Sequence, residues 1–329
     1  MRPELRDHLH RGLRDSAVDL VFPAAREPAA LLPLVGAAAA LVGWRPTAEL
    51  LAAARFLRLF INPGAGVQGI VHLFRELNTG REPPVVLVNG HGNACFTAQH
   101  TVALLLALTN RILPHHNWLA AGRWRTGDAE AASLPLRGRR LALLGYGHVN
   151  RRVHRLLAGF PLEFAALRRD WRNAAQDPPT PLRRCGTAEL AELLDWADIL
   201  VCCLPETSAT RGLIGRDELV RLGRRGLLVN VGRGPVVDEN ALYEALDQGL
   251  IAGAALDVWY DYQPAADSTG RRHPWHRPFN ELNNVVLSPH RAASPFDDLG
   301  RWNEVIENLK RLAAGRDDFL NVVDLELGY

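Results

Sequence analysis

From residue 138 onward, short apolar runs alternate with amphipathic stretches, and a glycine, a proline or a charged residue separates them. The apolar runs, which predict β-strands, cover residues 141–144, 162–167, 199–204, 227–231, 252–258 and 285–287. Strands that are apolar on both faces are typical of a parallel sheet covered by helices on each side. The pattern therefore predicts a βαβ series that forms a doubly wound parallel sheet.

The chain on either side of this region alternates less regularly. Its predicted pieces are a small-residue helical stretch near 31–42, strand-like pieces near 56–61 and 85–88, helices over 97–111 and 297–314, and a strand candidate at 322–323. A C-terminal helix that returns to the first domain would make that domain discontinuous. We therefore expect two α/β domains, of which the middle one carries the doubly wound sheet.

Composition narrows the range of functions. The 329 residues are 47% hydrophobic and 22% charged, which is typical of a globular protein with two domains. The formal net charge is only +2, and the arginines are scattered among acids, so a nucleic-acid partner is not expected. Lys310 is the single lysine. Walker-type phosphate loops, Schiff-base chemistry and pyridoxal-phosphate sites are excluded, because each needs a lysine in a defined pocket.

Cysteine usage and the chain start indicate a compartment. Cys95, Cys185, Cys202 and Cys203 show no C-x-x-C spacing and are predicted to be reduced thiols, and no metal site is expected. The first residues lack the apolar stretch of a signal peptide, and no apolar segment approaches the roughly 20 residues of a membrane span. These features predict a cytoplasmic protein without a membrane partner.

A strand, a glycine-rich turn and a helix follow one another at residues 141–157. In a dinucleotide-binding fold the first glycine, here Gly145, makes the tight turn. The second, Gly147, lets the pyrophosphate approach backbone N–H groups at the start of the helix. The third glycine of that motif is replaced by Asn150, which we expect to loosen the contact between helix and strand.

The second strand of the series ends at Arg168 and Arg169. An NAD enzyme places an acid there on the ribose 2′-hydroxyl, whereas an NADP enzyme places an arginine on the 2′-phosphate. The two arginines favour NADP. Asp170 keeps NAD as an alternative cofactor. If the arginines have no binding function, they belong to a solvated, arginine-rich loop.

Two later strands end in residues suited to redox chemistry on a carboxylic acid. Arg233 lies between two glycines after the strand at 227–231, where its guanidinium can hold a substrate carboxylate. His290 follows the strand at 285–287. An imidazole titrates near neutral pH, so it can donate a proton to a reduced carbonyl oxygen and take it back in the reverse reaction.

Together these segments resemble the D-isomer-specific 2-hydroxyacid dehydrogenase family. The motifs that carry the resemblance are Gly145-x-Gly147, Gly212-Leu213-Ile214, residues 229–239, residues 254–258 and Ser288-Pro289-His290, in family order. The resemblance extends from about residue 55 to the end. It implies a Rossmann nucleotide domain over 113–292, a discontinuous flavodoxin-like substrate domain formed by 1–112 and 293–329, and a homodimer with 118–136 as an interface arm.

The resemblance also implies roles for individual residues. Arg233 would grip the substrate carboxylate, His290 would be the acid/base, and the backbone of Ala65 and Gly66 would bind the same carboxylate. The residues expected to bind the cofactor are Tyr146, Gly147, His148, Val149, Asn150, Arg168, Arg169, Leu204, Pro205, Val231 and Asp257.

The chain departs from the family at the acid that orients the histidine. That acid is usually a glutamate five residues after the equivalent of Asp257 and just before a proline. The stretch here is one residue longer, so counting from Asp257 gives Tyr262, whereas counting back from Pro264 gives Gln263. Formate dehydrogenases pair their histidine with a glutamine before proline, so Gln263 is the predicted catalytic partner. Tyr262 and Asp261 are the alternatives.

The sequence therefore favours an NADP(H)-dependent oxidoreductase, with NAD as the alternative cofactor. It would reduce a small 2-oxo acid such as glyoxylate or hydroxypyruvate to the D-2-hydroxy acid. One rival is a formate-dehydrogenase-like enzyme, suggested by Gln263 before proline. The other is a nucleotide-sensing binding protein without turnover, suggested by the altered partner of His290.

Overall fold

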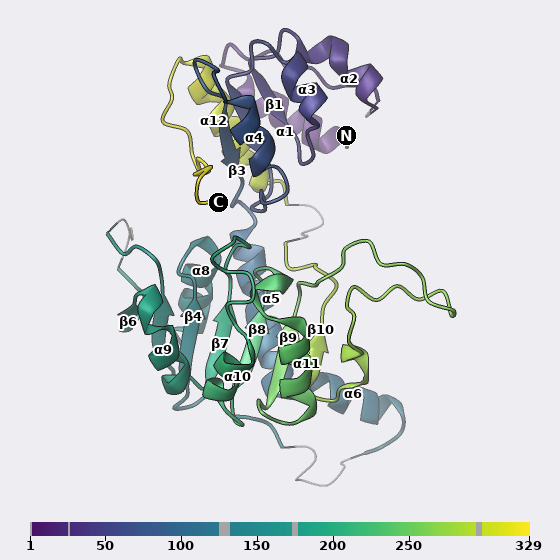
Figure 1. The fold of residues 1–329 in the computed structure, drawn as a ribbon, viewed down its shortest axis with the longest axis vertical. Coiled ribbons are helices and arrows are strands. Elements are labelled where there is room, and N and C mark those ends of the chain that lie inside the picture. Colours follow the sequence, from purple (N-terminus) through teal and green to yellow (C-terminus); the bar gives the residue numbers. More distant parts are fainter. Residues whose placement is uncertain (1, 26, 125–131, 173–176, 294–297) are drawn as a thin grey trace. The chain divides into compact units, whose positions relative to one another are not determined.

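The structure is a computed structural model of the whole chain and describes residues 2–25, 27–124, 132–172, 177–293 and 298–329. It contains two compact units (Figure 1). Unit 1 comprises Met1–Asn93 with Pro295–Tyr329, and unit 2 comprises Ala94–Ser294. Both ends of the chain thus belong to unit 1.

Unit 2 is built around a seven-stranded parallel sheet in the order β10-β9-β8-β7-β4-β5-β6. Its strands are β4 (Arg140–Leu144), β5 (Glu163–Leu167), β6 (Leu182–Cys185), β7 (Ile199–Cys202), β8 (Leu227–Asn230), β9 (Gly253–Leu256) and β10 (Val285–Leu287). Successive strands run outward from β4 in one direction and then from β7 in the other. The predicted doubly wound parallel sheet is confirmed.

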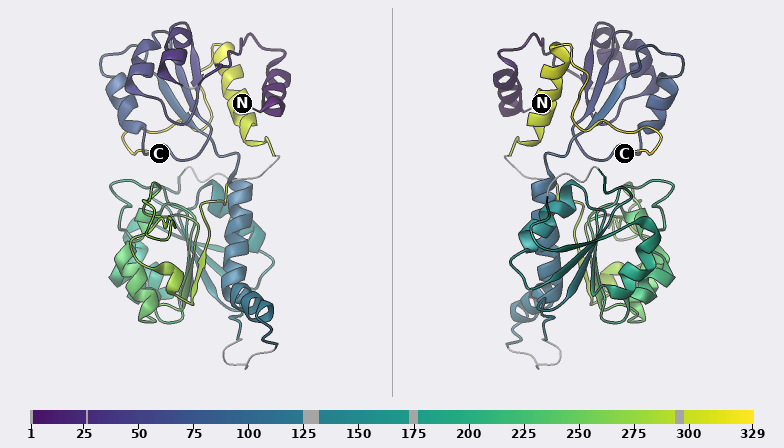
Figure 2. Two further views of the ribbon diagram at one scale, coloured as in Figure 1. Left: turned by 90° about the vertical axis from the view of Figure 1, so that its right-hand side faces the viewer. Right: turned by 90° about the vertical axis from the view of Figure 1, so that its left-hand side faces the viewer.

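Helices cover both faces of this sheet (Figure 2). They are α5 (Ala94–Thr109), α6 (Ile112–Ala120), α8 (His148–Leu157), α9 (Leu190–Trp196), α10 (Arg216–Leu222) and α11 (Glu239–Asp247), with 3₁₀ turns η1 (Thr187–Glu189), η2 (Gly234–Val236) and η3 (Phe279–Glu281). Among these described helices and those of unit 1, none is long and apolar enough to span a bilayer.

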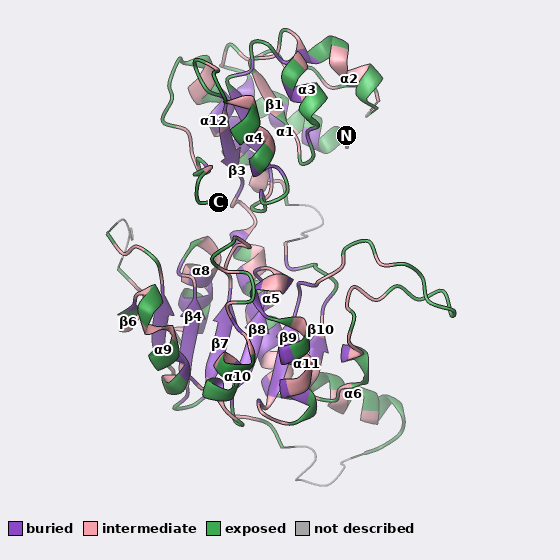
Figure 3. Cartoon of the chain, in the orientation of Figure 1, coloured by how far each residue is buried: buried purple, intermediate pink, exposed green. Residues whose placement is uncertain are grey.

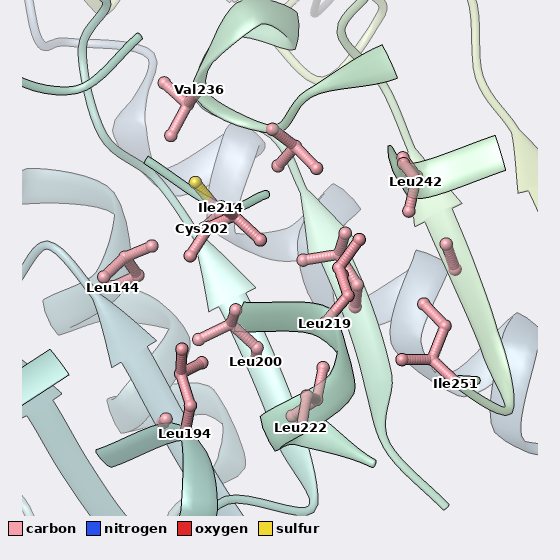
Figure 4. Close-up of a cluster of buried hydrophobic side chains, with 14 of the residues drawn as sticks. Leu144, Leu194, Leu200, Cys202, Ile214, Leu219, Leu222, Val236, Leu242 and Ile251 are labelled. Carbon is pink, nitrogen blue, oxygen red and sulfur yellow. The ribbon is translucent and has the colours of Figure 1, made fainter. Parts of the chain in front are cut away.

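The two faces have separate cores because side chains alternate along each strand. On β4, Leu141 and Leu143 join a cluster that includes residues of α5 and α8. The alternate residues Ala142 and Leu144 belong to the opposite cluster, with residues of α9, α10 and α11 (Leu144 is labelled in Figure 4). Both faces of β4 are fully buried, which explains its uninterrupted apolar run. Each fully buried leucine contributes about 2 kcal/mol of transfer free energy.

Strand β6 was not predicted from the sequence. It pairs with β5 only, at the edge of the sheet, and Cys185 is its one buried residue. Arg183 and Arg184 interrupt its apolar pattern. An edge strand needs fewer apolar side chains than a central strand, so its sequence resembles a loop.

The division into units differs from the boundary expected after residue 112. Helix α5 lies in unit 2, because it packs along α8 and against strands β8, β9 and β10. The structure therefore divides the chain at Asn93, at the start of α5, and at Ser294 near the second expected boundary. Of the expected interface arm, residues 125–131 lie outside the described part of the chain.

Unit 1 contains a three-stranded parallel sheet in the order β1-β2-β3. Its elements are α1 (Pro3–Leu13), α2 (Pro28–Val35), β1 (Ala40–Val42), α3 (Ala48–Ala53), β2 (Leu59–Asn62), α4 (Val71–Leu77), β3 (Val86–Asn89) and α12 (Arg301–Ala313). Strand β2 is buried throughout, and its labelled neighbour β3 is drawn mostly in the colour of buried residues in Figure 3. Leu59 and Ile61 contact the side of α1 and α12, and Phe60 packs with Phe74 of α4.

Two expectations for unit 1 need correction. The helix expected near 31–42 is wrong in its second half, because α2 ends at Val35 and the chain turns at Gly36 before entering β1. The strand candidate at 322–323 is only an isolated antiparallel bridge between Val88 and Val322. In both cases the local apolar pattern was too short to identify the element.

Candidate active site

The residues that the sequence singled out in unit 2 lie one to three positions beyond the ends of strands. They are Gly145, Arg168, Leu204, Pro205, Val231, Arg233, Asp257 and His290. Because all strands of the sheet are parallel, these residues lie along a single edge. In open α/β sheets, ligands bind at this edge, near the point where the strand order reverses. Here that point is between β4 and β7.

The glycine-rich turn fits the close approach of a dinucleotide. Gly145 has φ +84° and donates its N–H to Leu167 O at 3.0 Å. The positive φ favours glycine, and a Cβ at this position would lie 2.9 Å from Leu204 Cδ2, which would have to move. Gly147 is the N-cap of α8, whose first residues present backbone N–H groups to the same edge.

The side chain of Tyr146 is buried beneath this turn. Its hydroxyl and His154 Nδ1 lie 2.9 Å apart, and His154 Nε2 is 2.8 Å from Thr180 Oγ1. His154 is fully buried and packs on Phe164 with 4.1 Å between ring centroids. Tyr146 therefore supports the turn through its side chain, and only its backbone faces a ligand.

Burial lowers the pKa of His154 to about 4. The unfolded chain binds this proton near pH 6.5, so the unfolded state gains protons first as pH falls. We expect a stabilising contribution that is complete above pH 6.5 and is lost between pH 6.5 and 4, on the order of 3 kcal/mol at most. Thermal unfolding of the wild type and His154→Gln across this range should show a shallower dependence in the variant. Equal slopes would contradict the assignment.

Asn150 does more than occupy the place of the third glycine. It is fully buried, and its amide nitrogen donates to Gly145 O at 2.6 Å and to Leu144 O and Val201 O at 3.3 Å. The expectation of a looser contact is therefore wrong. The side chain ties α8 to the ends of β4 and β7.

Four cationic or titratable side chains gather beside the glycine-rich turn: His148, Arg151, Arg152 and Arg168. Arg168 Nη1 donates to Tyr146 O at 3.3 Å. Burial, followed by the charges of the three arginines, lowers the pKa of His148 to about 4. Arg169 beside them is exposed. Like charges held together in this way would be relieved by a bound anion, and a phosphate group suits guanidinium donors.

Asp170, the residue that kept NAD as an alternative cofactor, forms an ion pair with Arg172. Its carboxylate accepts from Arg172 Nη2 at 2.9 Å and from the Arg172 backbone N–H at 2.8 Å. These bonds lower the pKa of Asp170 to about 2. In this structure the Asp170 carboxylate is thus paired with Arg172.

Arg233 is held by a tight turn after β8. Asn230 accepts from Gly232 N–H at 3.1 Å and donates to Arg233 O at 3.1 Å, while Arg233 Nη1 donates to Gly232 O at 2.6 Å. A Cβ on Gly234 would lie 2.2 Å from Trp259 O, so the turn packs directly on the backbone after β9. Burial lowers the pKa of the guanidinium, and the nearby Tyr262 and Glu206 oppose this shift.

Asp257 organises the segment that carries His290. Its buried carboxylate accepts from Ser288 Oγ at 2.5 Å, from Arg291 N–H at 2.8 Å and from Ala292 N–H at 3.0 Å. His100 Nε2 of α5 lies 2.9 Å from Ser288 Oγ. The carboxylate expected to border the nicotinamide is thus an anchor of the 288–292 segment.

His290 follows this anchor with φ +55° and an exposed side chain. Partial desolvation and the charge of Arg233 lower the pKa of its imidazole, and Asp257 acts in the opposite direction. The ring of Tyr262 lies edge-on to it, with 5.3 Å between centroids. Gln263 is exposed, and within the described residues no hydrogen bond joins it to His290. Arg233 and His290 therefore come together, and Tyr262 is the neighbour of the imidazole.

Four other residues expected to bind the cofactor also make contacts within the protein. Leu204 contacts Gly145 and the core, Val231 is buried, and Pro205 O accepts from Thr210 Oγ1 at 2.7 Å. Val149 packs on the core cluster of α5 and α8.

In unit 1, two buried asparagines shape the loop at Ala65 and Gly66. Asn62 donates to Gly64 O at 2.6 Å and Gly66 O at 2.9 Å, and Asn89 donates to Ala65 O at 2.8 Å. These bonds use the loop carbonyls. Within the described part of the chain, the N–H groups of Ala65 and Gly66 make no hydrogen bond with protein atoms, so they can donate to an anion.

Three residues of the site were missed in the sequence. Ser288 and His100 complete the network of Asp257, and Glu206 lies close enough to Arg233 and Tyr262 to influence their pKa values. Ser288 belongs to the Ser-Pro-His motif, which was assigned only to its histidine. No local signal marks Glu206. Among the described residues, no group of three or more His, Cys, Asp or Glu could hold a metal ion.

Comparison with known families agrees with this geometry. The family described as "D-isomer specific 2-hydroxyacid dehydrogenase, NAD binding domain" matches residues 102–292, more than half of the chain. The chain belongs to this family. Unit 2 thus contains the NAD-binding domain of a family of oxidoreductases, and a nicotinamide cofactor fits the glycine-rich turn that Gly145 makes possible.

Curated relatives carry several enzyme names. The chain is 31% identical over 275 residues to a D-3-phosphoglycerate dehydrogenase of Archaeoglobus fulgidus, covering 82% of this chain and 47% of that protein. It is 33% identical over 220 residues to a glyoxylate reductase of Korarchaeum cryptofilum, covering 65% and 61%. A formate dehydrogenase of Chaetomium thermophilum is 30% identical over 274 residues, covering 83% and 72%. The chain spans about half the length of the phosphoglycerate dehydrogenase.

Solved structures match over both units. A D-isomer specific 2-hydroxyacid dehydrogenase from Xanthobacter autotrophicus Py2, in complex with NADPH and MES, has a TM-score of 0.77 and 25% identity over 100% of this chain and 96% of that chain. An NADPH-dependent glyoxylate/hydroxypyruvate reductase from Sinorhizobium meliloti, in complex with NADP and malonate, has a TM-score of 0.66 and 29% identity over 88% and 84%.

Proposed function

We propose that this protein reduces a small 2-oxo acid, of the glyoxylate or hydroxypyruvate type, to the D-2-hydroxy acid with NADPH as the electron donor. The observation that carries the proposal is the convergence of Arg233 and His290, 57 positions apart in the numbering, at the carboxyl edge of the sheet of unit 2. The guanidinium charge acts directly on the imidazole. The glyoxylate reductases among the relatives support the choice of substrate.

The chemistry divides between the cofactor and the protein. Bound nicotinamide supplies the hydride. Arg233 holds the substrate carboxylate with its planar pair of donors. His290 gives a proton to the oxygen that gains negative charge during reduction. Asp257 keeps His290 in place by fixing the N–H groups of residues 291 and 292.

NADP preference follows from the arginines beside the glycine-rich turn. We expect Arg168→Asp combined with Arg169→Ala to lower the ratio of kcat/KM with NADPH to that with NADH by about 10²-fold, because a carboxylate repels the 2′-phosphate. Steady-state kinetics with both cofactors measures this ratio. Arg221→Ala is a matched control, since Arg221 lies on α10, is about half exposed and pairs with Asp195. An unchanged ratio in the double variant would remove the 2′-phosphate assignment.

A single panel of assays tests the function. Oxidation of NADPH and NADH is followed with glyoxylate, hydroxypyruvate, phenylpyruvate and longer 2-oxo acids, and formate plus NADP or NAD is tested in the opposite direction. Turnover of the small 2-oxo acids with NADPH is the expected result. Cofactor binding without turnover of any substrate would favour a nucleotide-sensing protein instead.

Formate oxidation is the second candidate. The sequence 257–259 reads Asp-Val-Trp, and Trp259 Nε1 donates to Ser288 O at 2.8 Å beside the segment of His290. The formate dehydrogenase among the relatives points in the same direction. The glutamine that suggested this alternative gives it less support, because Gln263 is exposed and donates only its backbone N–H, to Asp261, among the described contacts.

We also propose that the protein forms a homodimer. Helix α6 has no buried residue within unit 2, and it exposes Ile112, Leu113 and Leu119, with Trp124 beyond its end. Such an apolar surface is typical of a face that another chain covers.

A further inference from the structure

The imidazole of His290 needs a neighbour that fixes its orientation, and the described structure offers three candidates in the segment after β9. Asp261 accepts the backbone N–H of Gln263 at 2.7 Å, so its carboxylate closes a turn of its own segment. Gln263 is exposed. Tyr262 contacts the imidazole directly, with the ring planes at 60° and 5.3 Å between centroids.

The hydroxyl end of Tyr262 is fixed as well. Its oxygen accepts the backbone N–H of Trp259 at 3.3 Å. Trp259 is buried and bonds the carbonyl of Ser288, two residues before His290. Tyr262 thus connects two parts of the same framework: its hydroxyl is bonded to Trp259, and its ring, which is 54% exposed, lies edge-on to the imidazole.

Tyr262 carries no negative charge next to the imidazole of His290. Burial raises the pKa of its phenol, and the Trp259 N–H and the charge of Arg233 act in the opposite direction, with a net upward shift. The phenol is therefore neutral at physiological pH. Its interaction with His290 is an edge-to-face aromatic contact, which fixes geometry without stabilising an imidazolium as a carboxylate does.

Three charged groups act on the imidazole of His290, and the one carboxylate among these three already has hydrogen-bond donors of its own. Arg233 after β8 and Arg291 on the same segment disfavour the imidazolium. Asp257 after β9 favours it, but its oxygens already accept from Ser288, Arg291 and Ala292.

We propose that Tyr262 is the positioning residue of His290 in this chain: an uncharged aromatic side chain orients the imidazole beside Arg233, in the place where a hydrogen-bonding acid or amide would otherwise be expected. The inference deepens the proposed function for the same site. It predicts that ring shape at position 262 controls turnover, and that negative charge at this position changes the titration of His290.

Two readouts test this proposal, and only one depends on turnover. Histidine ring signals of the apo protein are titrated by NMR, with the His290 signal assigned from its loss in His290→Gln. We expect Tyr262→Glu to raise the titration midpoint of His290 by about one pH unit, because a nearby carboxylate favours the imidazolium. Tyr262→Leu should move the His290 signal by removing the ring beside it.

Kinetics then separate orientation from charge. We expect Tyr262→Leu to lower kcat for 2-oxo acid reduction about tenfold, with KM for NADPH changed less than about threefold, and Tyr262→Phe to recover most of the loss because it keeps the ring. Tyr243→Phe, which removes a hydroxyl on α11, is the matched control and should behave like the wild type.

The outcomes are distinguishable. If no 2-oxo acid is turned over, the proposed function fails, and the NMR titration still decides the role of Tyr262. An unchanged midpoint in Tyr262→Glu, together with an unmoved His290 signal in Tyr262→Leu, overturns the inference. So does a tenfold loss of kcat in Gln263→Ala when Tyr262→Leu is fully active.

Discussion

Replacing Arg233 with alanine is expected to lower kcat/KM for reduction of a small 2-oxo acid by about 10³-fold, which makes it one of the two most damaging single changes in the molecule. The guanidinium offers two parallel N–H donors to the substrate carboxylate, and its burial strengthens that interaction. Arg233→Lys keeps the charge but loses the planar pair of donors, so we expect a loss of about 10²-fold. Steady-state kinetics with glyoxylate or hydroxypyruvate measures both.

The control for this experiment is an arginine with an ordinary surface role. Arg216 of α10 pairs with Glu244 of α11 at 3.2 Å, and half of its side chain is exposed. Arg216→Ala should retain activity within about threefold, because exposed ion pairs contribute little. Affinity for NADPH, measured by fluorescence titration, should be unchanged in Arg233→Ala. A variant that lost cofactor binding and activity together would assign Arg233 to the cofactor instead.

The turn that holds Arg233 explains why the sequence singled out this residue. Glycine on each side allows the backbone to pass close to Leu204 and to Trp259, where a Cβ would clash. A charged residue between two such glycines at the end of an apolar run has few structural explanations. The same reasoning identified the turn at Gly145, where a positive φ and a close neighbour both require glycine.

The fold of unit 2 could be predicted from the apolar pattern of its strands, because the central strands are buried on both faces. The runs at β4, β7, β8 and β9 have no exposed position, so hydrophobicity alone marked them. β6 gave no such signal because it lies at the sheet edge. In unit 1 the elements are short: β1 has 3 residues and α3 has 6, and packing against the rest of the unit stabilises them more than local propensity does.

Side-chain hydrogen bonds were the least predictable part of the site. The sequence showed that Asn150 replaces a glycine, and a missing glycine suggested poorer packing. Its three bonds to carbonyl oxygens depend on the distance between α8 and the ends of two strands, which no local pattern encodes. Likewise, the segment after Asp257 is one residue longer than usual, so counting from its two ends predicted two different partners for His290. The path of the chain brings the ring of Tyr262, and not Gln263, next to the imidazole.

Replacing His290 with glutamine is expected to lower kcat for 2-oxo acid reduction by about 10²- to 10³-fold, because the imidazole supplies the proton that the reduced carbonyl oxygen needs. Affinity for NADPH should be retained, and fluorescence titration provides that control. If the protein oxidises formate instead, the same variant should keep much of its activity, since that reaction transfers no proton at this site.

The pH dependence of the wild type adds a second, independent signature of His290. Desolvation and the charge of Arg233 hold the pKa of the imidazole below its ordinary value near 6.5. Reduction needs the protonated imidazole, so its kcat/KM, which reports groups of the free enzyme, should fall as pH rises through that lowered pKa. Oxidation of the 2-hydroxy acid needs the neutral form and should rise over the same interval. Because one group controls both directions, the two opposite slopes should vanish together in His290→Gln, and a variant that kept either slope would place the proton donor elsewhere.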